Sequence, residues 1–126
     1  MDFSLSDRQL AWRDRVREFM TGHVIPAAEK YRSHVQGSPE SRWDVPPIIE
    51  ELKARAYAEG LWNLFLPPSG HDDEDYHGAG LSNLEYALCA EEMGRVSFAS
   101  EAFNCSAPDT GNMEILHRYG TPEQKA

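Results

Sequence analysis

The residues of this chain that could carry out chemistry are concentrated in one segment, GHDDEDYHGAG, at positions 70–80. Counting from Asp73 gives the alternating ligands and the sixth-position glycine of a calcium-binding loop. Position twelve is Leu84, however, where such a loop needs a bidentate acid, and Glu85 comes one residue too late. The segment also lacks paired thiolates or helix-spaced histidines for zinc. We therefore predict a solvated acidic loop that binds no metal.

The same region contains GAGLSN, which begins at Gly78 and nearly matches a dinucleotide-binding fingerprint. Asn83 stands where the third glycine is needed, no strand precedes the segment, and the acidic residues beside it would repel a pyrophosphate. Elsewhere the five histidines are scattered, and no nucleophile, base and orienting group can be assembled by spacing. The residues alone therefore indicate no catalytic side chain.

Composition restricts the class of protein. The chain has 126 residues, of which 40% are hydrophobic and 26% charged, and its net charge is −9. A charge of this sign disfavours nucleic acid as a partner, and no apolar run approaches the roughly 20 residues of a membrane span. Cys89 and Cys105 are too few for a disulfide framework, and the N-terminus has no signal-peptide core. We expect a cytoplasmic protein.

The elements that must position any site are predicted to be helices. Ser6 with Gln9, and Ser82 with Glu85, are capping boxes that begin amphipathic runs. Helical spacing and stop signals predict helices over Ser6–Gly22, a shorter stretch starting near Pro26, about Asp44–Gly60, Ser82–Gly94, about Phe98–Cys105 and about Asp109–Tyr119. No convincing strand is present, so the fold is predicted to be an all-α domain of about six helices.

The last residues, YGTPEQKA, have the features of a helix start. Thr121 is a suitable N-cap, Pro122 suits the first helical position, and Gln124 is placed to complete a capping box. A start signal this complete so close to residue 126 suggests that the chain is a fragment of a longer protein.

Four long segments of the chain resemble the N-terminal helical domain of the acyl-CoA dehydrogenase family. They occur in that family's order and spacing and together span essentially the whole of residues 1–126: FSLSDRQLAWRDRVREFMTGHVIPAAEKY, IIEELKARAYAEGLWNLFLPP, GAGLSNLEYALCAEEMGR and YGTPEQK. Within the family, EGLWNLFLP, GLSNLEYA and FNCSAPDTGNMEILHRYGTPEQK are similar to the branch formed by family members 10 and 11. The loop at Ser69 to His77 departs from this pattern, because many family members have a Gly-Gly pair and fewer acids there.

The resemblance implies a function for the longer protein. In this family a β-barrel domain and a C-terminal helical domain follow, and together they hold most of the flavin adenine dinucleotide and the catalytic glutamate. The implied reaction is α,β-dehydrogenation of an acyl-CoA thioester in fatty-acid oxidation, in which a carboxylate removes the α proton and the flavin accepts hydride. The present residues would then be inactive alone. Homo-oligomers are also implied.

By the same resemblance, this chain would supply one wall of the acyl-tail cavity and cover for the flavin site. The wall candidates are Phe98, Glu101, Phe103 and Asn104, although the two phenylalanines could equally be plain core residues. Glu101 and Asn104 are the more informative pair if buried, since polar groups facing an apolar tail are costly unless a partner satisfies them. The alternative reading is a self-sufficient helical module that binds a lipid or a protein helix, without enzyme activity.

Overall fold

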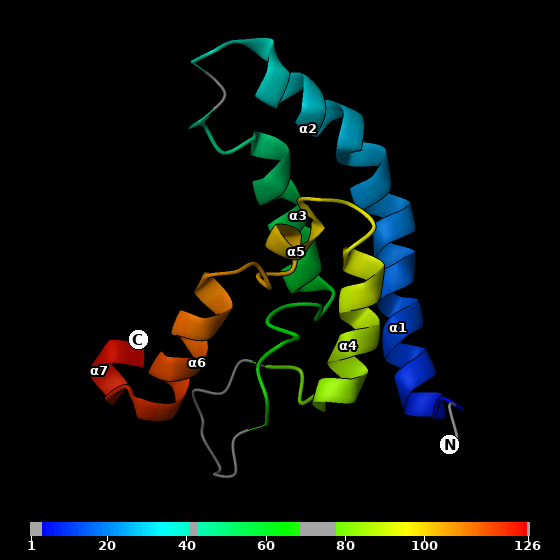
Figure 1. Cartoon of the computed structure of the whole chain (residues 1–126), viewed down its shortest axis with the longest axis vertical. Coiled ribbons are helices and arrows are strands. Elements are labelled where there is room, and N and C mark those ends of the chain that lie inside the picture. Colours follow the sequence, from blue (N-terminus) through cyan, green and yellow to red (C-terminus); the bar gives the residue numbers. More distant parts are fainter. Residues whose placement is uncertain (1–3, 41–42, 69–77, 126) are drawn as a thin grey trace.

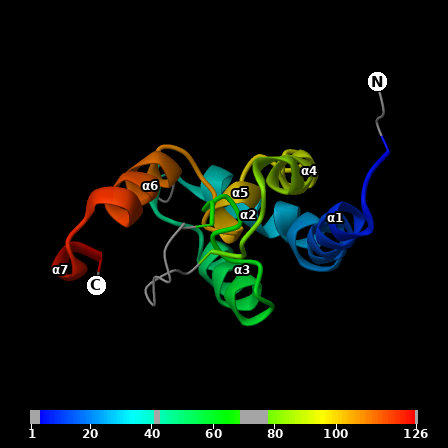
Figure 2. The same cartoon turned by 90° about the horizontal axis from the view of Figure 1, so that it is seen from below.

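The structure, a computed structural model, describes residues 4–40, 43–68 and 78–125. Its helical elements are α1 (Asp7–Phe19), the π-helix η1 (Met20–Val24), α2 (Ile25–Gly37), α3 (Pro47–Ala58), α4 (Asn83–Met93), α5 (Ala99–Ala102), α6 (Asp109–Tyr119) and α7 (Pro122–Lys125). No strand occurs in these ranges, so the prediction of an all-α domain is confirmed. The long run from α1 to α2 forms one side of the molecule, and α6 with α7 lies at the opposite end (Figures 1 and 2).

The capping boxes predicted at Ser6 and at Ser82 are confirmed. The Ser6 backbone N–H donates to Gln9 Oε1 at 2.8 Å, and Gln9 N–H donates back to Ser6 Oγ at 3.3 Å. At the start of α4, Ser82 N–H donates to Glu85 Oε2 at 2.7 Å, and Glu85 N–H donates to Ser82 Oγ at 3.3 Å. These helix starts depend on residues three apart in sequence, which is why a local pattern identifies them.

The prediction that Gly22 ends the first helix was wrong. The backbone of Phe19 and of Ile25, on either side of η1, is helical, so α1, η1 and α2 form one uninterrupted run. The Ile25 N–H donates to Met20 O, the five-residue spacing of a π-helix. Pro26 has no N–H and its ring would crowd the carbonyl four residues earlier in a regular α-helix. The wider π turn just before Pro26 lets the helix continue past it.

The third helix begins three residues later than predicted, at Pro47, because Pro46 and Pro47 together disfavour helical backbone at the residues before them. It ends at Ala58, two residues before the predicted end at Gly60, and Gly60 is the residue that stops it. Gly60 has φ +68°, Leu61 N–H donates to Ala56 O at 2.8 Å, and Gly60 N–H donates to Tyr57 O at 3.1 Å. This pattern is a Schellman motif, for which glycine is the favoured residue.

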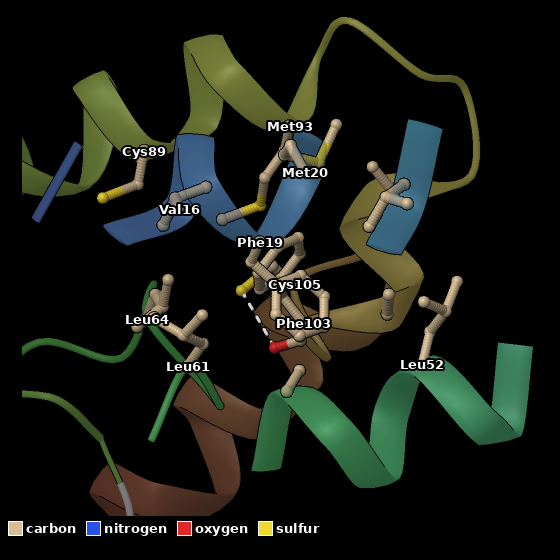
Figure 3. Packing of buried hydrophobic residues seen from close by; sticks show 14 of the residues in the cluster. Val16, Phe19, Met20, Leu52, Leu61, Leu64, Cys89, Met93, Phe103 and Cys105 are labelled. Atoms are coloured by element: carbon tan, nitrogen blue, oxygen red, sulfur yellow. Dashed lines mark hydrogen bonds between the residues drawn. The ribbon is translucent and has the colours of Figure 1, made fainter. Parts of the chain in front are cut away.

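The hydrophobic core lies where α1, η1, α3, α4 and α5 meet. Its largest fully buried side chains are Phe103, Met20, Ile49, Leu61, Leu64, Leu81, Val16, Val24 and Cys89. Figure 3 shows Phe103 and Phe19 at the centre of this cluster, between Met20 and the loop bearing Leu61 and Leu64. Helix α6 contributes no buried residue, which sets it apart from the packed body of the domain.

Candidate functional site

Helix α5 and its two ends carry the four predicted wall residues, but their side chains have different surroundings. Phe98, just before α5, is 7% exposed and stacks on Tyr31 of α2 with ring centroids 4.2 Å apart. It lines a groove of about 410 Å³ between α2 and residues 95–98. Phe103, just after α5, is fully buried and meets Phe19 edge to face at 5.1 Å. Phe103 therefore packs in the core of this domain.

Glu101 is only half-buried and is paired. Lys53 Nζ of α3 lies 2.7 Å from Glu101 Oε1, and the Glu101 side chain is 38% exposed. The hydrogen bond to Glu101 raises the pKa of Lys53, and a second ion pair joins Lys53 to Glu50 at 3.2 Å. The carboxylate of Glu101 is thus held against α3 by Lys53.

Asn104 is joined to a residue that the sequence analysis did not select. Its Nδ2 donates to Asn63 Oδ1 at 2.7 Å and lies 3.5 Å from the sulfur of Met113. Asn104 has φ 55° and Asn63 has φ 54°, so both occupy the left-handed region. Among non-glycine residues, asparagine, aspartate and histidine are the most often found in this region. The asparagine residue type is therefore the one feature of the sequence that could have pointed to Asn63.

Asn63 also lines a small groove between the loop after α3 and the C-terminal helices. The groove has a volume of about 180 Å³ and is lined by Asn63, Leu66, Met113, Leu116, His117, Gln124 and Lys125. Its floor is mainly apolar, from Leu66, Met113 and Leu116, and its polar side chains come mainly from α6 and α7. Asn104 does not line this groove itself but contacts two residues that do, Asn63 and Met113. Phe98 instead lines the groove between α2 and residues 95–98.

The two cysteines are not candidate nucleophiles. Burial raises the pKa of the Cys89 thiol to about 11 and also raises that of Cys105, so both are neutral thiols near pH 7. The Cys105 thiol donates to Phe103 O at 3.3 Å, as Figure 3 shows. Both side chains are part of the core.

The start of α4 does not fit the pyrophosphate of a dinucleotide. At this helix start the Ser82 N–H and the Glu85 N–H each donate to the other residue's side chain. Glu85 is also paired with Arg8, whose Nε is 2.6 Å from Glu85 Oε1. A buried carboxylate in this position excludes a second anion. The near-fingerprint at GAGLSN is therefore a structural helix start. The acidic loop at Ser69 to His77 lies outside the described residues, and in those that are described no cluster of potential metal ligands occurs.

Sequence comparison identifies the class of protein to which this helical domain belongs. Residues 6–126 match the family model described as "Acyl-CoA dehydrogenase, N-terminal domain". The chain belongs to the acyl-CoA dehydrogenase family. None of the helices in the described part of the chain is long and apolar enough to cross a bilayer.

Individual relatives agree with this assignment. The chain is 55% identical over 115 residues to "Acyl-CoA dehydrogenase family member 11" of Gallus gallus, covering 88% of this chain and 13% of the relative. It is 55% identical over 113 residues to "Acyl-CoA dehydrogenase family member 10" of Mus musculus, covering 90% of this chain and 10% of the relative. The resemblance to the branch of members 10 and 11 is therefore confirmed.

A solved structure agrees as well. It is described as "Structure of a putative acyl-CoA dehydrogenase from Mycobacterium abscessus" and superposes with a TM-score of 0.83 at 48% identity. The match covers 98% of this chain and 30% of the other chain. The chain thus spans less than a third of the length of each of these proteins.

Proposed function

We propose that this chain is the N-terminal part of a flavin-dependent enzyme that dehydrogenates acyl-CoA thioesters between the α and β carbons. The observation that carries the proposal is the 55% identity to two acyl-CoA dehydrogenase family members over about nine tenths of the chain. The substrate is an acyl-CoA, the cofactor is FAD, and the process is fatty-acid oxidation. The intact protein is proposed to be a cytoplasmic homo-oligomer.

In this proposal the flavin and the catalytic base belong to the remainder of the longer protein. The start of α4 is filled by Glu85 and Arg8, so we assign no flavin contact to it. The contribution of this chain is a wall beside the acyl tail and cover for the flavin site. Glu101 and Asn104 support the wall assignment best, because both are partly exposed polar groups fixed by neighbours, Lys53 and Asn63. Phe98 and Phe103 remain wall candidates whose observed contacts are with other aromatic rings.

Exposed apolar side chains on α6 fit a chain that is covered by further protein. Ile115 is 60% exposed, Leu116 45% and Tyr119 79%. A helix of 11 residues with no buried residue is marginal in water without tertiary packing. A covering domain or a second subunit would supply that packing.

The test is to express the longer protein that contains this chain and to mix it with a saturated acyl-CoA in the absence of oxygen. Bleaching of the oxidised flavin absorbance and formation of the enoyl-CoA are expected, while free coenzyme A should produce neither. The 126-residue chain alone should purify without flavin and show no activity.

A second candidate function is a self-sufficient helical module that binds a lipid or a protein helix. The grooves beside Phe98 and Asn63 are the observation in its favour. A longer protein that binds acyl-CoA without oxidising it, together with an isolated chain that binds lipid as tightly as the longer protein does, would favour this alternative over the dehydrogenase.

A further inference from the structure

We propose that Asn63 contacts the ligand directly, donating a hydrogen bond from Nδ2 to an acceptor oxygen on an aliphatic chain, and that Asn104 is the positioning residue that orients the Asn63 amide. The site is the groove lined by Leu66, Met113 and Leu116 beside Asn63. The identification of the aliphatic chain as an acyl chain rests on the proposed function, whereas the donor and the groove do not.

The orientation of the Asn104 amide follows from its two neighbours. Its Nδ2 is 2.7 Å from Asn63 Oδ1 and 3.5 Å from the Met113 sulfur, and both of these atoms are acceptors. Turning the Asn104 amide over would place its oxygen against the sulfur. The sulfur therefore fixes Asn104 as the donor and Asn63 as the acceptor in this pair.

This pairing determines what Asn63 offers to the groove. Its Oδ1 is occupied by Asn104, so the other end of the amide is the NH₂ group with two donor hydrogens. Within residues 4–40, 43–68 and 78–125, the Nδ2 of Asn63 donates to no side chain or backbone group, and it is not enclosed away from solvent. An accessible donor in a mainly apolar groove is available to a ligand.

The backbone holds Asn63 in place. Its N–H donates to Phe103 O at 3.2 Å, and its carbonyl accepts from Leu66 N–H at 3.0 Å. Asn63 has φ 54° and Asn104 has φ 55°. This backbone conformation is energetically unfavourable for residues other than glycine, and such residues cluster at functional sites. Two such residues bonded to each other fix the position of one donor group at the groove wall.

The lining defines the chemical class of the ligand. Leu66, Met113 and Leu116 suit a short aliphatic segment, and the volume of about 180 Å³ is similar to the roughly 150 Å³ of an engineered cavity that holds benzene. The Asn63 donor suits an acceptor oxygen on that segment. A carbonyl and a hydroxyl oxygen are both acceptors, but only the hydroxyl can also donate, so ligands with one or the other separate the two sources.

The experiment is an NMR titration of the full 126-residue chain, observing the Asn63 side-chain NH₂ with three probes of similar size: hexane, hexan-2-one and hexan-2-ol. One net hydrogen bond corresponds to about a fivefold difference in affinity. We expect hexan-2-one and hexan-2-ol to bind about fivefold more tightly than hexane and to shift the Asn63 NH₂ resonances downfield. Hexane should perturb the methyl groups of Leu66 and Leu116 without that downfield shift.

Two variants separate contact from positioning. Asn63→Asp keeps an oxygen that accepts from Asn104 and tolerates the left-handed backbone, but it removes the donor, so the preference for hexan-2-one over hexane should disappear. Asn104→Asp replaces the donor by an acceptor, so the Asn63 amide should turn over and present its oxygen to the groove. Hexan-2-one should then lose its advantage while hexan-2-ol, which can donate, keeps it.

A preference for hexan-2-one that survives Asn63→Asp would overturn the proposal, as would equal binding of all three probes to the wild-type chain. A ketone preference that survives Asn104→Asp would remove the positioning role of Asn104. The wild-type titration needs no variant, so misfolding of a variant does not prevent a decision. These results are independent of dehydrogenase activity: an inactive longer protein with an Asn63-dependent ketone preference would refute the proposed function alone.

Discussion

Arg17 and Glu92 lie 75 positions apart in the sequence and join α1 to α4 through a hydrogen-bonded ion pair. Arg17 Nη2 is 2.6 Å from Glu92 Oε1, and its Nε donates to the same oxygen at 3.0 Å. Arg95 approaches the other carboxylate oxygen at 3.1 Å. The Glu92 side chain is 8% exposed, whereas the Arg17 side chain is 45% exposed. A nearly buried acid is therefore satisfied by two arginines that water can still reach.

The first prediction concerns Glu92→Gln. The hydrogen bond from Arg17, followed by that from Arg95, holds the pKa of Glu92 below its usual value of 4.5. Because this pKa is lower in the folded chain than in the unfolded chain, the stabilisation is present above about pH 4.5 and is lost as pH falls through the folded-state pKa. Glu92→Gln should lower the free energy of unfolding at pH 7 by about 1 kcal/mol, a modest value because Arg17 remains solvated.

Urea unfolding of both proteins at pH 7 and pH 3 checks this, with Glu91→Gln on the exposed side of α4 as the control. The difference between wild type and Glu92→Gln should shrink at pH 3. A difference that stayed the same at both pH values would exclude an ionic contribution from Glu92.

The second prediction compares two glycines. Gly60 has φ +68°, and a Cβ added there would meet its nearest neighbour, Arg15 Nη2, at an ordinary 3.7 Å. Gly60→Ala should therefore destabilise the chain by about 1 kcal/mol through backbone strain alone. Gly111 lies inside α6, and a Cβ there would meet nothing within 4 Å. Gly111→Ala should stabilise α6 by about 0.5–1 kcal/mol. Thermal unfolding followed by circular dichroism measures both, and shifts of the same sign would contradict the comparison.

The third prediction is that the apolar side of α6 drives self-association of the isolated chain. Exposed Ile115 and Tyr119 form a surface that water does not favour. Sedimentation velocity at rising concentration should show dimers or larger species, which Ile115→Lys with Tyr119→Lys should abolish. Glu114→Lys provides a charge-changing control on the same helix and should leave association in place. A wild-type chain that remains monomeric and binds no hydrophobic dye would refute the prediction.

The fourth prediction tests the proposed wall residue Glu101 in the longer protein. Glu101→Leu removes a polar group that Lys53 holds in place, so plain acyl tails should gain about tenfold in kcat/KM over hydroxylated tails, with unchanged flavin content. The matched control is Glu50→Leu, which removes the other ion pair of Lys53 and leaves Glu101 intact. An unchanged preference in a stable, flavin-loaded Glu101→Leu protein would place Glu101 outside the wall. Asn104→Leu is a poor companion, because leucine is strained at φ 55°.

Most of the fold could be predicted because its signals are local. Ser6 with Gln9 and Ser82 with Glu85 are each contained within four residues, and Gly60 marks a chain reversal by itself. The continuation of the first helix through Pro26 could not be predicted, since proline normally begins a new helix and the compensating π turn has no clear sequence pattern.

The candidate site was harder to predict from the sequence, because its residues are brought together by tertiary packing. Asn104 was selected from the sequence, but its partner Asn63 is 41 residues away, and only the packing of α5 against α3 brings the two together. The pairing of Lys53 with Glu101 likewise depends on that packing. The surroundings of the two phenylalanines also could not be predicted from the sequence. Phe98 borders a groove, whereas Phe103 is fully buried.

The π turn at Met20–Val24 changes the direction in which one helix presents its side chains. A π turn contains about one residue more than an α turn, and each residue of an α-helix advances the chain by about 100° around the axis. The inward side of α2 is therefore rotated relative to that of α1, so one helical run can pack on α4 along its first half and on α3 along its second. Without that extra residue, the side chains of Ala27 and Tyr31 would turn away from α3 and from Phe98. One extra residue in the turn thus rotates the side-chain directions of the second half of the helix, so that the two halves pack on different helices.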